Sequence, residues 1–185
     1  MSRSEFDLDW VATAEEIVDF IRRIVDKARA DGVVLGLSGG VDSSLVATLS
    51  VKALGKEKVL GVLMPTDFTP AEDIQDARDL ARLLGIQTKY VAIRPVMDSF
   101  IAALEMDNAD PRVKIPLANI CSRIRMVVLY YFANLNNYLV AGTGDRSEDL
   151  IGYFTKYGDG GVDFLPTSHL YKTQVRKLAE YLGVP

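Results

Sequence analysis

Cysteine and histidine are almost absent from this sequence. Cys121 is the one cysteine among 185 residues, so no disulfide can form within the chain, and a reducing compartment is the expected setting. The one histidine, His169, excludes histidine-rich metal sites. It lies in no nucleophile-elbow context, so we expect a structural role for it. These absences disfavour hydrolases that pair a serine or cysteine nucleophile with histidine.

Long apolar runs and an excess of positive charge are also missing. No stretch has the length of apolar sequence that crosses a bilayer, and the first ten residues lack the basic start and apolar run of a signal peptide. The formal net charge is −4, which disfavours a nucleic-acid scaffold. We therefore expect a cytoplasmic protein with neither a membrane nor a nucleic acid as its partner.

Short apolar runs alternate with segments of helical periodicity. Apolar runs predict strands at 33–37, 59–64, 88–93 and 138–141. A capping box that starts at Thr13 predicts the first helix, which ends near residues 31–32. Further helices are predicted at 43–54, 69–84, 96–105, 117–135 and 171–182, with a short helical turn near Ser147. This alternation predicts an α/β fold, a doubly wound parallel sheet with helices on both faces, in one domain over 1–185.

Parallel sheets of this kind bind ligands at the carboxyl ends of their strands. Four predicted loops follow strands or interrupt the helical pattern on that side. They cover residues 38–44, 65–69, 106–116 and 142–163. We expect the functional residues to lie in these loops or beside them.

The loop at 38–44 has the composition of a phosphate-binding turn. Gly39 and Gly40 let a phosphate approach the main chain, whose N–H groups form an anion site together with the following helix N-terminus. Ser38, Ser43 and Ser44 add hydroxyl donors, and the carboxylate of Asp42 is suited to a magnesium ion on the phosphates. A plain strand-to-helix turn is the alternative, but the clustering of these polar groups after one strand disfavours it.

The string from Ser38 to Ser43, SGGVDS, resembles the SGGxDS signature of the ATP pyrophosphatases, or PP-loop enzymes. That superfamily has a Rossmann-like, adenine nucleotide alpha hydrolase-like fold, binds the pyrophosphate of ATP and adenylates a substrate. Strings at 119–126, 142–148 and 170–175 resemble one member family, the ammonia-dependent NAD synthetases. The most discriminating string, at 152–161, reads GYFTKYGDGG. The resemblance spans roughly residues 33–185.

The resemblance implies an activity, a ligase that forms a carbon–nitrogen bond. It would amidate deamido-NAD to NAD with ammonia and ATP, through an adenylated intermediate, and release AMP and pyrophosphate. This is the last step of NAD biosynthesis. The substrates implied are deamido-NAD, ATP and ammonia, and the implied metal is Mg²⁺.

The resemblance also implies a set of site residues. The positions that match ATP contacts are Gly36, Leu37, Ser38, Gly39, Gly40, Val41, Asp42, Ser43, Thr143 and Lys172. The positions that match deamido-NAD contacts are Arg123, Lys156 and Asp163. Asp42 and Glu148 match the magnesium carboxylates, and Asp159 matches a carboxylate near the reacting centre.

Each charged residue also has a plainer interpretation. Arg123 and Arg125 fit solvent-facing charges on a helix, and for Arg125 we prefer that interpretation. Glu148 fits a helix cap. Lys156 and Asp159 fit a mobile loop without function.

Free ammonia, or ammonia from a partner subunit, is the expected nitrogen donor. Glutamine-using relatives carry an amidase domain with a catalytic cysteine, for which this chain has no room, and Cys121 sits among apolar neighbours. The family's C-terminal segment is expected to be absent. The family is typically homodimeric, and helix 117–135 fits either a dimer interface or the monomer core. Two other functions stay open, another PP-loop amidating enzyme and a non-catalytic or truncated nucleotide-binding paralogue.

Overall fold

The computed structural model describes residues 8–107 and 109–185. Residues 1–7, on which the signal-peptide prediction partly rests, and residue 108, within the predicted loop 106–116, lie outside the described residues. In chain order the elements are α1 (Trp10–Ala28), β1 (Gly32–Gly36), α2 (Val41–Leu54), η1 (Lys56–Lys58), β2 (Val59–Leu63), α3 (Ala71–Leu84), β3 (Gln87–Tyr90), α4 (Arg94–Ala103), η2 (Pro111–Val113), α5 (Lys114–Asn136), β4 (Tyr138–Val140), α6 (Arg146–Ile151) and α7 (Lys172–Tyr181).

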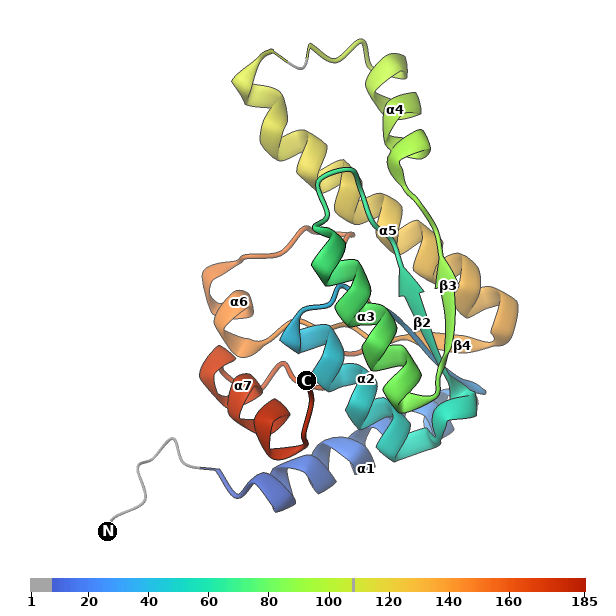
Figure 1. Cartoon of the computed structure of the whole chain (residues 1–185), viewed down its shortest axis with the longest axis vertical. Coiled ribbons are helices and arrows are strands. Elements are labelled where there is room, and N and C mark those ends of the chain that lie inside the picture. The colour runs from blue at the N-terminus through green and yellow to red at the C-terminus, as the bar shows by residue number, and fades with distance from the viewer. Residues whose placement is uncertain (1–7, 108) are drawn as a thin grey trace.

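The four strands form one parallel sheet in the order β3-β2-β1-β4 (Figure 1). The chain runs from β1 to β2 and β3 on one side, then returns to pair β4 with the other side of β1. Val33 pairs with both Val59 of β2 and Leu139 of β4. The strand order therefore reverses between β1 and β4, and ligands of such sheets bind outside the carboxyl ends of the strands at that point.

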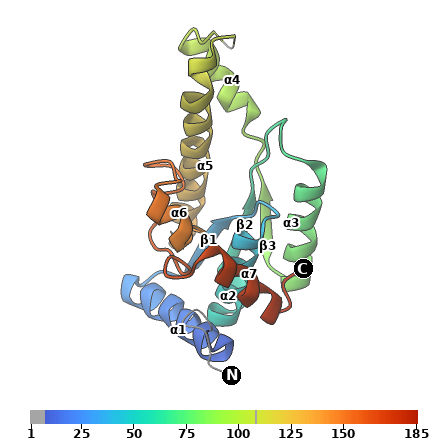
Figure 2. The ribbon, with the colours of Figure 1, turned by 90° about the vertical axis from the view of Figure 1, so that its left-hand side faces the viewer.

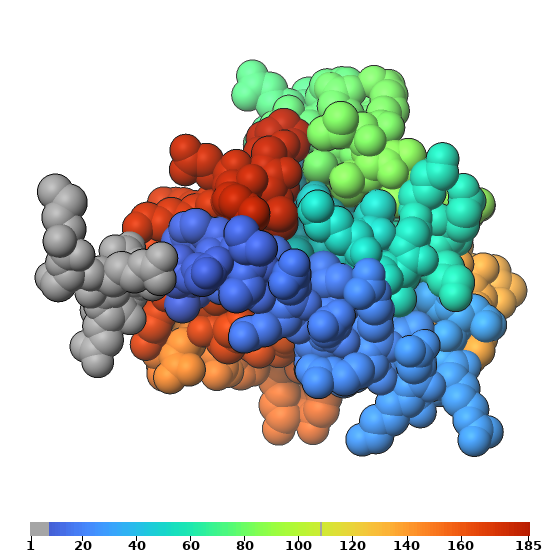
Figure 3. All heavy atoms as spheres, turned by 90° about the horizontal axis from the view of Figure 1, so that it is seen from below, coloured from blue at the N-terminus to red at the C-terminus, as the bar shows by residue number. Residues whose placement is uncertain are grey.

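Helices cover both faces of the sheet (Figure 2), because successive strand residues point to opposite faces. Val33 and Leu35 of β1 face a core made with α1, α2, α3 and α7. Val34 between them faces a second core, made with α4 and α5. On the first face α1 packs beside α2 and α7 (Figure 3). The predicted fold class is confirmed.

The predicted capping box at Thr13 is wrong. Helix α1 begins at Trp10, and Asp9 is its N-cap, with Oδ1 accepting from the N–H groups of Val11 at 3.1 Å and Ala12 at 3.2 Å. Thr13 lies inside the helix with its side chain buried. Asp9 therefore caps the helix one turn before Thr13, and the Thr13 side chain packs into the core instead of capping.

The predicted loop 106–116 is wrong over its last residues, because α5 already begins at Lys114. Pro116 lies in the first turn of that helix, where the backbone N–H has no intrahelical partner and proline is tolerated. Other predicted boundaries, apart from the end of α1 at Ala28, agree with the structure to within three residues. Among the described residues, no helix is both long and apolar enough to cross a membrane.

Ile21 of α1 is fully buried in the core that α1, α2, α3 and α7 form with the sheet. We therefore expect a large effect of shortening this side chain. Ile21→Ala should lower the free energy of unfolding by about 2–5 kcal/mol, since it removes buried methyl groups and leaves a cavity. Urea denaturation measures the change. Val11→Ala, at a 51% exposed position of the same helix, is the matched control. Equal losses in the two variants would contradict this packing.

Candidate active site

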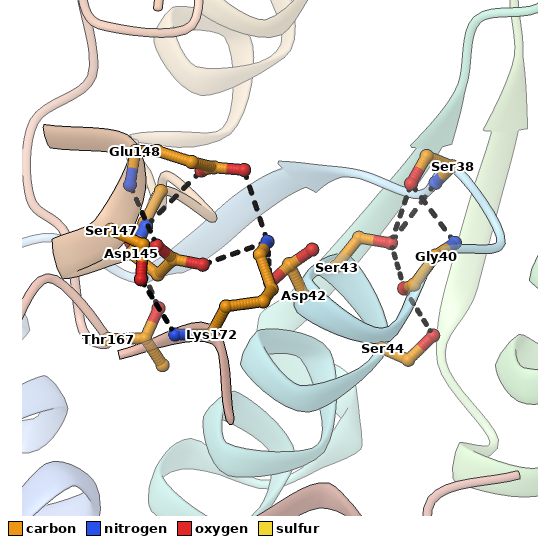
Figure 4. A network of polar contacts seen from close by, with 11 residues as sticks. Ser38, Gly40, Asp42, Ser43, Ser44, Asp145, Ser147, Glu148, Thr167 and Lys172 are labelled. Carbon is orange, nitrogen blue, oxygen red and sulfur yellow. Dashed lines mark hydrogen bonds and ion pairs between the residues drawn. The ribbon is translucent and has the colours of Figure 1, made fainter. Parts of the chain in front are cut away.

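The phosphate-loop residues follow β1 at the reversal point of the sheet. Ser38 Oγ lies 3.0 Å from Ser43 Oγ and accepts from the N–H of Gly40 at 3.2 Å. Ser43 and Ser44 both donate their hydroxyls to the Gly40 carbonyl, at 3.0 and 2.9 Å (Figure 4). These bonds fix the shape of the loop, so its N–H groups are positioned before any ligand binds.

One glycine is required where it stands in this loop. Gly39 has φ +84°, and a Cβ there would lie 2.3 Å from the Asp73 carbonyl of α3. Gly40 is the N-cap of α2, and no described side chain caps the N–H groups of the first turn. Those N–H groups remain available to an anion, which the helix dipole also favours.

Four charged side chains meet beside the loop (Figure 4). The Nζ atom of Lys172 contacts Asp42 Oδ1 at 2.8 Å, Asp145 Oδ2 at 2.8 Å and Glu148 Oε1 at 3.1 Å. Asp42 comes from the first turn of α2, Asp145 and Glu148 from the start of α6, and Lys172 from the start of α7. The cluster therefore joins three helices that are distant in sequence.

Lys172 and Asp145 are both charged at neutral pH. Burial by itself would lower the pKa of Lys172, but hydrogen bonds to Asp145, Asp42 and Glu148 outweigh it and raise that pKa. Burial would likewise raise the pKa of Asp145, yet Lys172 and the N–H of Glu148 hold it below its usual value. The side chain of Asp145 is fully buried, and its Oδ2 accepts no hydrogen bond of standard geometry. The ion pair at 2.8 Å therefore offsets that burial.

Asp145 is a site residue that the sequence reasoning missed. It is the N-cap of α6, with Oδ1 accepting from the N–H of Glu148 at 3.0 Å, while Glu148 Oε2 accepts from the N–H of Asp145 at 3.4 Å. The spacing of three positions between an aspartate and a glutamate is a capping-box signal that could have found it. Glu148 is both a cap residue and a member of the charged cluster, so its two interpretations are compatible.

The segment 152–161 is fastened to α5. Asp159 Oδ1 accepts from Ser122 Oγ at 2.6 Å and from the N–H of Thr155 at 3.0 Å. Arg123 Nε donates to the Lys156 carbonyl at 3.1 Å. A Cβ at Gly158 would lie 2.3 Å from Ser122 Oγ, so this glycine permits the close approach. The catalytic role of Asp159 stays a prediction, and its carboxylate here fixes the conformation of the segment.

Asp163 links β4 with α5. Its Oδ2 accepts from the N–H of Val140 at 2.7 Å, and its Oδ1 accepts from the Tyr130 hydroxyl at 2.9 Å. Burial and the nearby Asp163 raise the pKa of Tyr130 to about 12. Thr143 is half-buried on the stretch that follows β4. The structure thus brings together the phosphate loop, Asp42, Glu148 and Lys172, while the remaining predicted residues lie along α5 and the stretch after β4.

The interpretation of Arg125 as a solvent-facing charge is wrong. Its side chain is half-buried, and Nε donates to the Met64 carbonyl at 3.3 Å. The reason is that α5 lies flat against the sheet and carries position 125 to the carboxyl end of β2. Arg123, two residues earlier, is exposed.

The charged cluster predicts how stability depends on pH when Lys172 is replaced by Met. The folded pKa of Lys172 is raised and that of Asp145 lowered, so their contributions are complete between about pH 5 and 10 and fade only outside that range. Lys172→Met should cost about 2–3 kcal/mol at pH 7, because Asp145 is left buried without a counter-ion. The loss should shrink towards pH 4, where the unpaired carboxylate takes up a proton.

Urea denaturation of both proteins at pH 7 and pH 4.5 measures this difference. Lys89→Met, at an exposed position of β3, is the matched control for losing one positive charge. A loss that is equal at both pH values would show that Lys172 stabilises the fold by packing alone.

Comparison with known proteins gives consistent similarities. The family model described as NAD synthase matches residues 13–185. A curated relative named NH(3)-dependent NAD(+) synthetase, from Pyrobaculum aerophilum, is 53% identical over 95% of this chain. The chain spans 65% of the length of that relative.

Solved structures agree with this similarity. An NH3-dependent NAD synthetase from Campylobacter jejuni, in complex with the nitrate ion, has a TM-score of 0.88 and 42% identity, covering 96% of this chain and 75% of its own. An NMN synthetase from Francisella tularensis has a TM-score of 0.90 and 35% identity, covering 97% of this chain and 73% of its own. With the phosphate loop and charged cluster described above, these similarities show that the chain belongs to the NAD synthase family.

Proposed function

We propose that this protein amidates deamido-NAD to NAD, with ATP and ammonia as the other substrates. The observation that carries the proposal is the meeting of a preformed phosphate loop with the Lys172 cluster at the reversal point of the sheet. The similarity to relatives named NH(3)-dependent NAD(+) synthetase supports the choice of substrate and nitrogen donor.

ATP would bind along the first loop. The N–H groups and hydroxyls of residues 38–43 suit its phosphates, and Gly36 and Leu37 line the approach from β1. Lys172 has a side chain that is 28% exposed, so its ammonium is within reach of a phosphate at the cluster. Thr143, after β4, would contact ATP from the opposite side of the reversal point.

Magnesium fits beside these phosphates. Asp42 and Glu148 direct one oxygen each to the same ammonium group, so both face one position. Mg²⁺ is usually held by one or two carboxylates together with substrate phosphates. When bound, the ion would stabilise negative charge on the phosphates and on the leaving pyrophosphate.

The proposed reaction needs no protein nucleophile. An oxygen of the nicotinate carboxylate attacks the α-phosphorus of ATP, and the bond from that phosphorus to pyrophosphate breaks. Ammonia then attacks the adenylated carbonyl carbon, loses a proton, and the bond to AMP breaks. The protein holds two anionic substrates together and stabilises the charge that develops.

The second group of residues would hold deamido-NAD. The exposed cations Arg123 and Lys156 offset its negative charge, and Asp163 would contact it from the end of β4. Asp159 would orient ammonia or accept its proton. The segment 152–161, fastened to α5 through Ser122, would exclude water from the adenylate.

A second copy of the chain is the proposed partner. Helix α5 serves the monomer core and also leaves an apolar stripe in solvent. Met126 and Leu129 are buried, whereas Val127, Tyr131 and Leu135, spaced four residues apart, are 70%, 61% and 65% exposed. Such a stripe on one helix face is suited to an isologous contact between identical subunits.

Val127→Asp should convert the dimer to a monomer, because it places a charge in that stripe. Sedimentation equilibrium measures the mass, and Val11→Asp, at an exposed position of α1, should leave the dimer intact. A wild-type protein that sediments as a monomer at micromolar concentration would rule out this interface.

The function is tested by pyrophosphate release from the purified protein with ATP, magnesium and ammonium. Release should require deamido-NAD and should be matched by NAD formation. Nicotinate mononucleotide is a second acceptor to test, because a similar structure is named NMN synthetase. Binding of ATP without release would support the alternative of a nucleotide-binding protein without turnover.

Asp42→Asn should lower kcat by about a hundredfold or more, since it removes one proposed magnesium carboxylate. Asp19→Asn, an exposed change on α1, is its control. Unchanged turnover in Asp42→Asn would remove this residue from the mechanism.

A further inference from the structure

Half-buried positive charges are few in this protein. Of the lysines and arginines in the described ranges, only Arg94, Arg125 and Lys172 are half-buried, and the others are exposed. Arg94 contacts two carboxylates, Asp67 and Asp98, and Lys172 contacts three. Arg125 forms no ion pair with any carboxylate of the described residues. It is therefore the one half-buried cation whose charge the described part of the protein leaves unneutralised.

Arg125 lies at the edge of the sheet where ligands of this fold bind. Its Nε atom donates to the carbonyl of Met64, the residue directly after β2. The Met64 side chain in turn lies against the end of β1, because a Cβ at Gly36 would sit 3.3 Å from Met64 Cε. The guanidinium is thus held at the carboxyl end of β2, the strand that pairs with β1, and it comes from α5 on the face of the sheet opposite α2.

Within the described residues, Arg125 makes one hydrogen bond, which leaves most of its N–H donors unused. The bond to Met64 occupies Nε, and no hydrogen bond from Nη1 or Nη2 to a described residue accompanies it. A partly desolvated charge without a counter-ion is unfavourable. A guanidinium fixed at Nε presents its two remaining nitrogens in a plane, which matches the two oxygens of a phosphate or carboxylate.

We propose that Arg125 binds an oxyanion of a substrate held at this edge, either a phosphate of ATP or the nicotinate carboxylate of deamido-NAD. Its Nε bond to Met64 orients the guanidinium for that contact. This inference rests on the proposed function and adds a binding residue to it. The bound oxyanion would neutralise the positive charge of Arg125, which no carboxylate of the described residues pairs with.

Two pairs of ligands test the proposal, and each pair differs in one anionic group. ATP and adenosine differ in the phosphates, and deamido-NAD and NAD differ in the carboxylate. Isothermal titration calorimetry measures the Kd of all four for the wild-type protein and for Arg125→Gln, which keeps an N–H donor but no charge. Arg23→Gln, an exposed change on α1, is the matched control.

In one pair, Arg125→Gln should weaken binding of the ligand that carries the extra anionic group about tenfold or more, and should change binding of the ligand that lacks it by less than about twofold. A loss for ATP but not adenosine assigns the contact to phosphate, and a loss for deamido-NAD but not NAD assigns it to the carboxylate. Equal effects within both pairs, or none, would overturn the proposal and leave Arg125 a purely structural residue.

Arg125→Lys keeps the test valid if Arg125→Gln does not fold. Lysine retains the charge, but it cannot bond Met64 and also present two coplanar donors, so the same ligand should weaken about threefold or more. Unchanged selectivity in Arg125→Lys would then overturn the proposal. A wild-type protein that binds none of the four ligands would overturn the proposed function as well, whereas wild-type binding that the Arg125 variants leave unchanged overturns only this inference.

Discussion

The ion pairs of Lys172 are the interaction on which the rest of the structure depends. One ammonium group holds carboxylates from the starts of α2 and α6, and Lys172 itself begins α7. Three carboxylates against one ammonium leave a formal charge of −2 in a partly buried place. Removal of Lys172 would be costly, because Asp145 would be left buried without a counter-ion. The same residues therefore fix the starts of three helices beside the first loop, and their excess negative charge supports the magnesium site that we propose there.

On the opposite face of the sheet, α5 and the segment 152–161 carry residues that we propose as contacts to deamido-NAD. Helix α5 packs against the sheet with Met126 and Leu129, and it holds the segment 152–161 through Ser122 and Arg123. Two layers of helices thus bring separate groups of polar residues to one edge of the sheet. A reaction between two anionic substrates requires this kind of arrangement, because each substrate needs its own set of cations and N–H donors.

Much of the fold and part of the site could be predicted from the sequence. Apolar runs and helical periodicity are local signals, and the phosphate loop is a contiguous string, so both were recognisable. The ion pair of Asp145 and the half-buried position of Arg125 were not predicted, because they depend on Lys172 and Met64, which lie 27 and 61 positions away along the chain. The start of α1 was misplaced for a different reason, since Asp9 and Thr13 are both acceptable caps and only packing of Thr13 into the core decides between them.

The path of one oxygen atom tests most directly whether this site activates a carboxylate by adenylation. Deamido-NAD labelled with ¹⁸O in its nicotinate carboxylate would be turned over with unlabelled ATP, magnesium and ammonium, and the products separated by mass spectrometry. Attack on the α-phosphorus at the phosphate loop predicts that AMP carries one labelled oxygen while pyrophosphate carries none. Label in inorganic phosphate or pyrophosphate, with unlabelled AMP, would mean that the carboxylate attacks a different phosphorus, and the mechanism assigned to this site would be wrong.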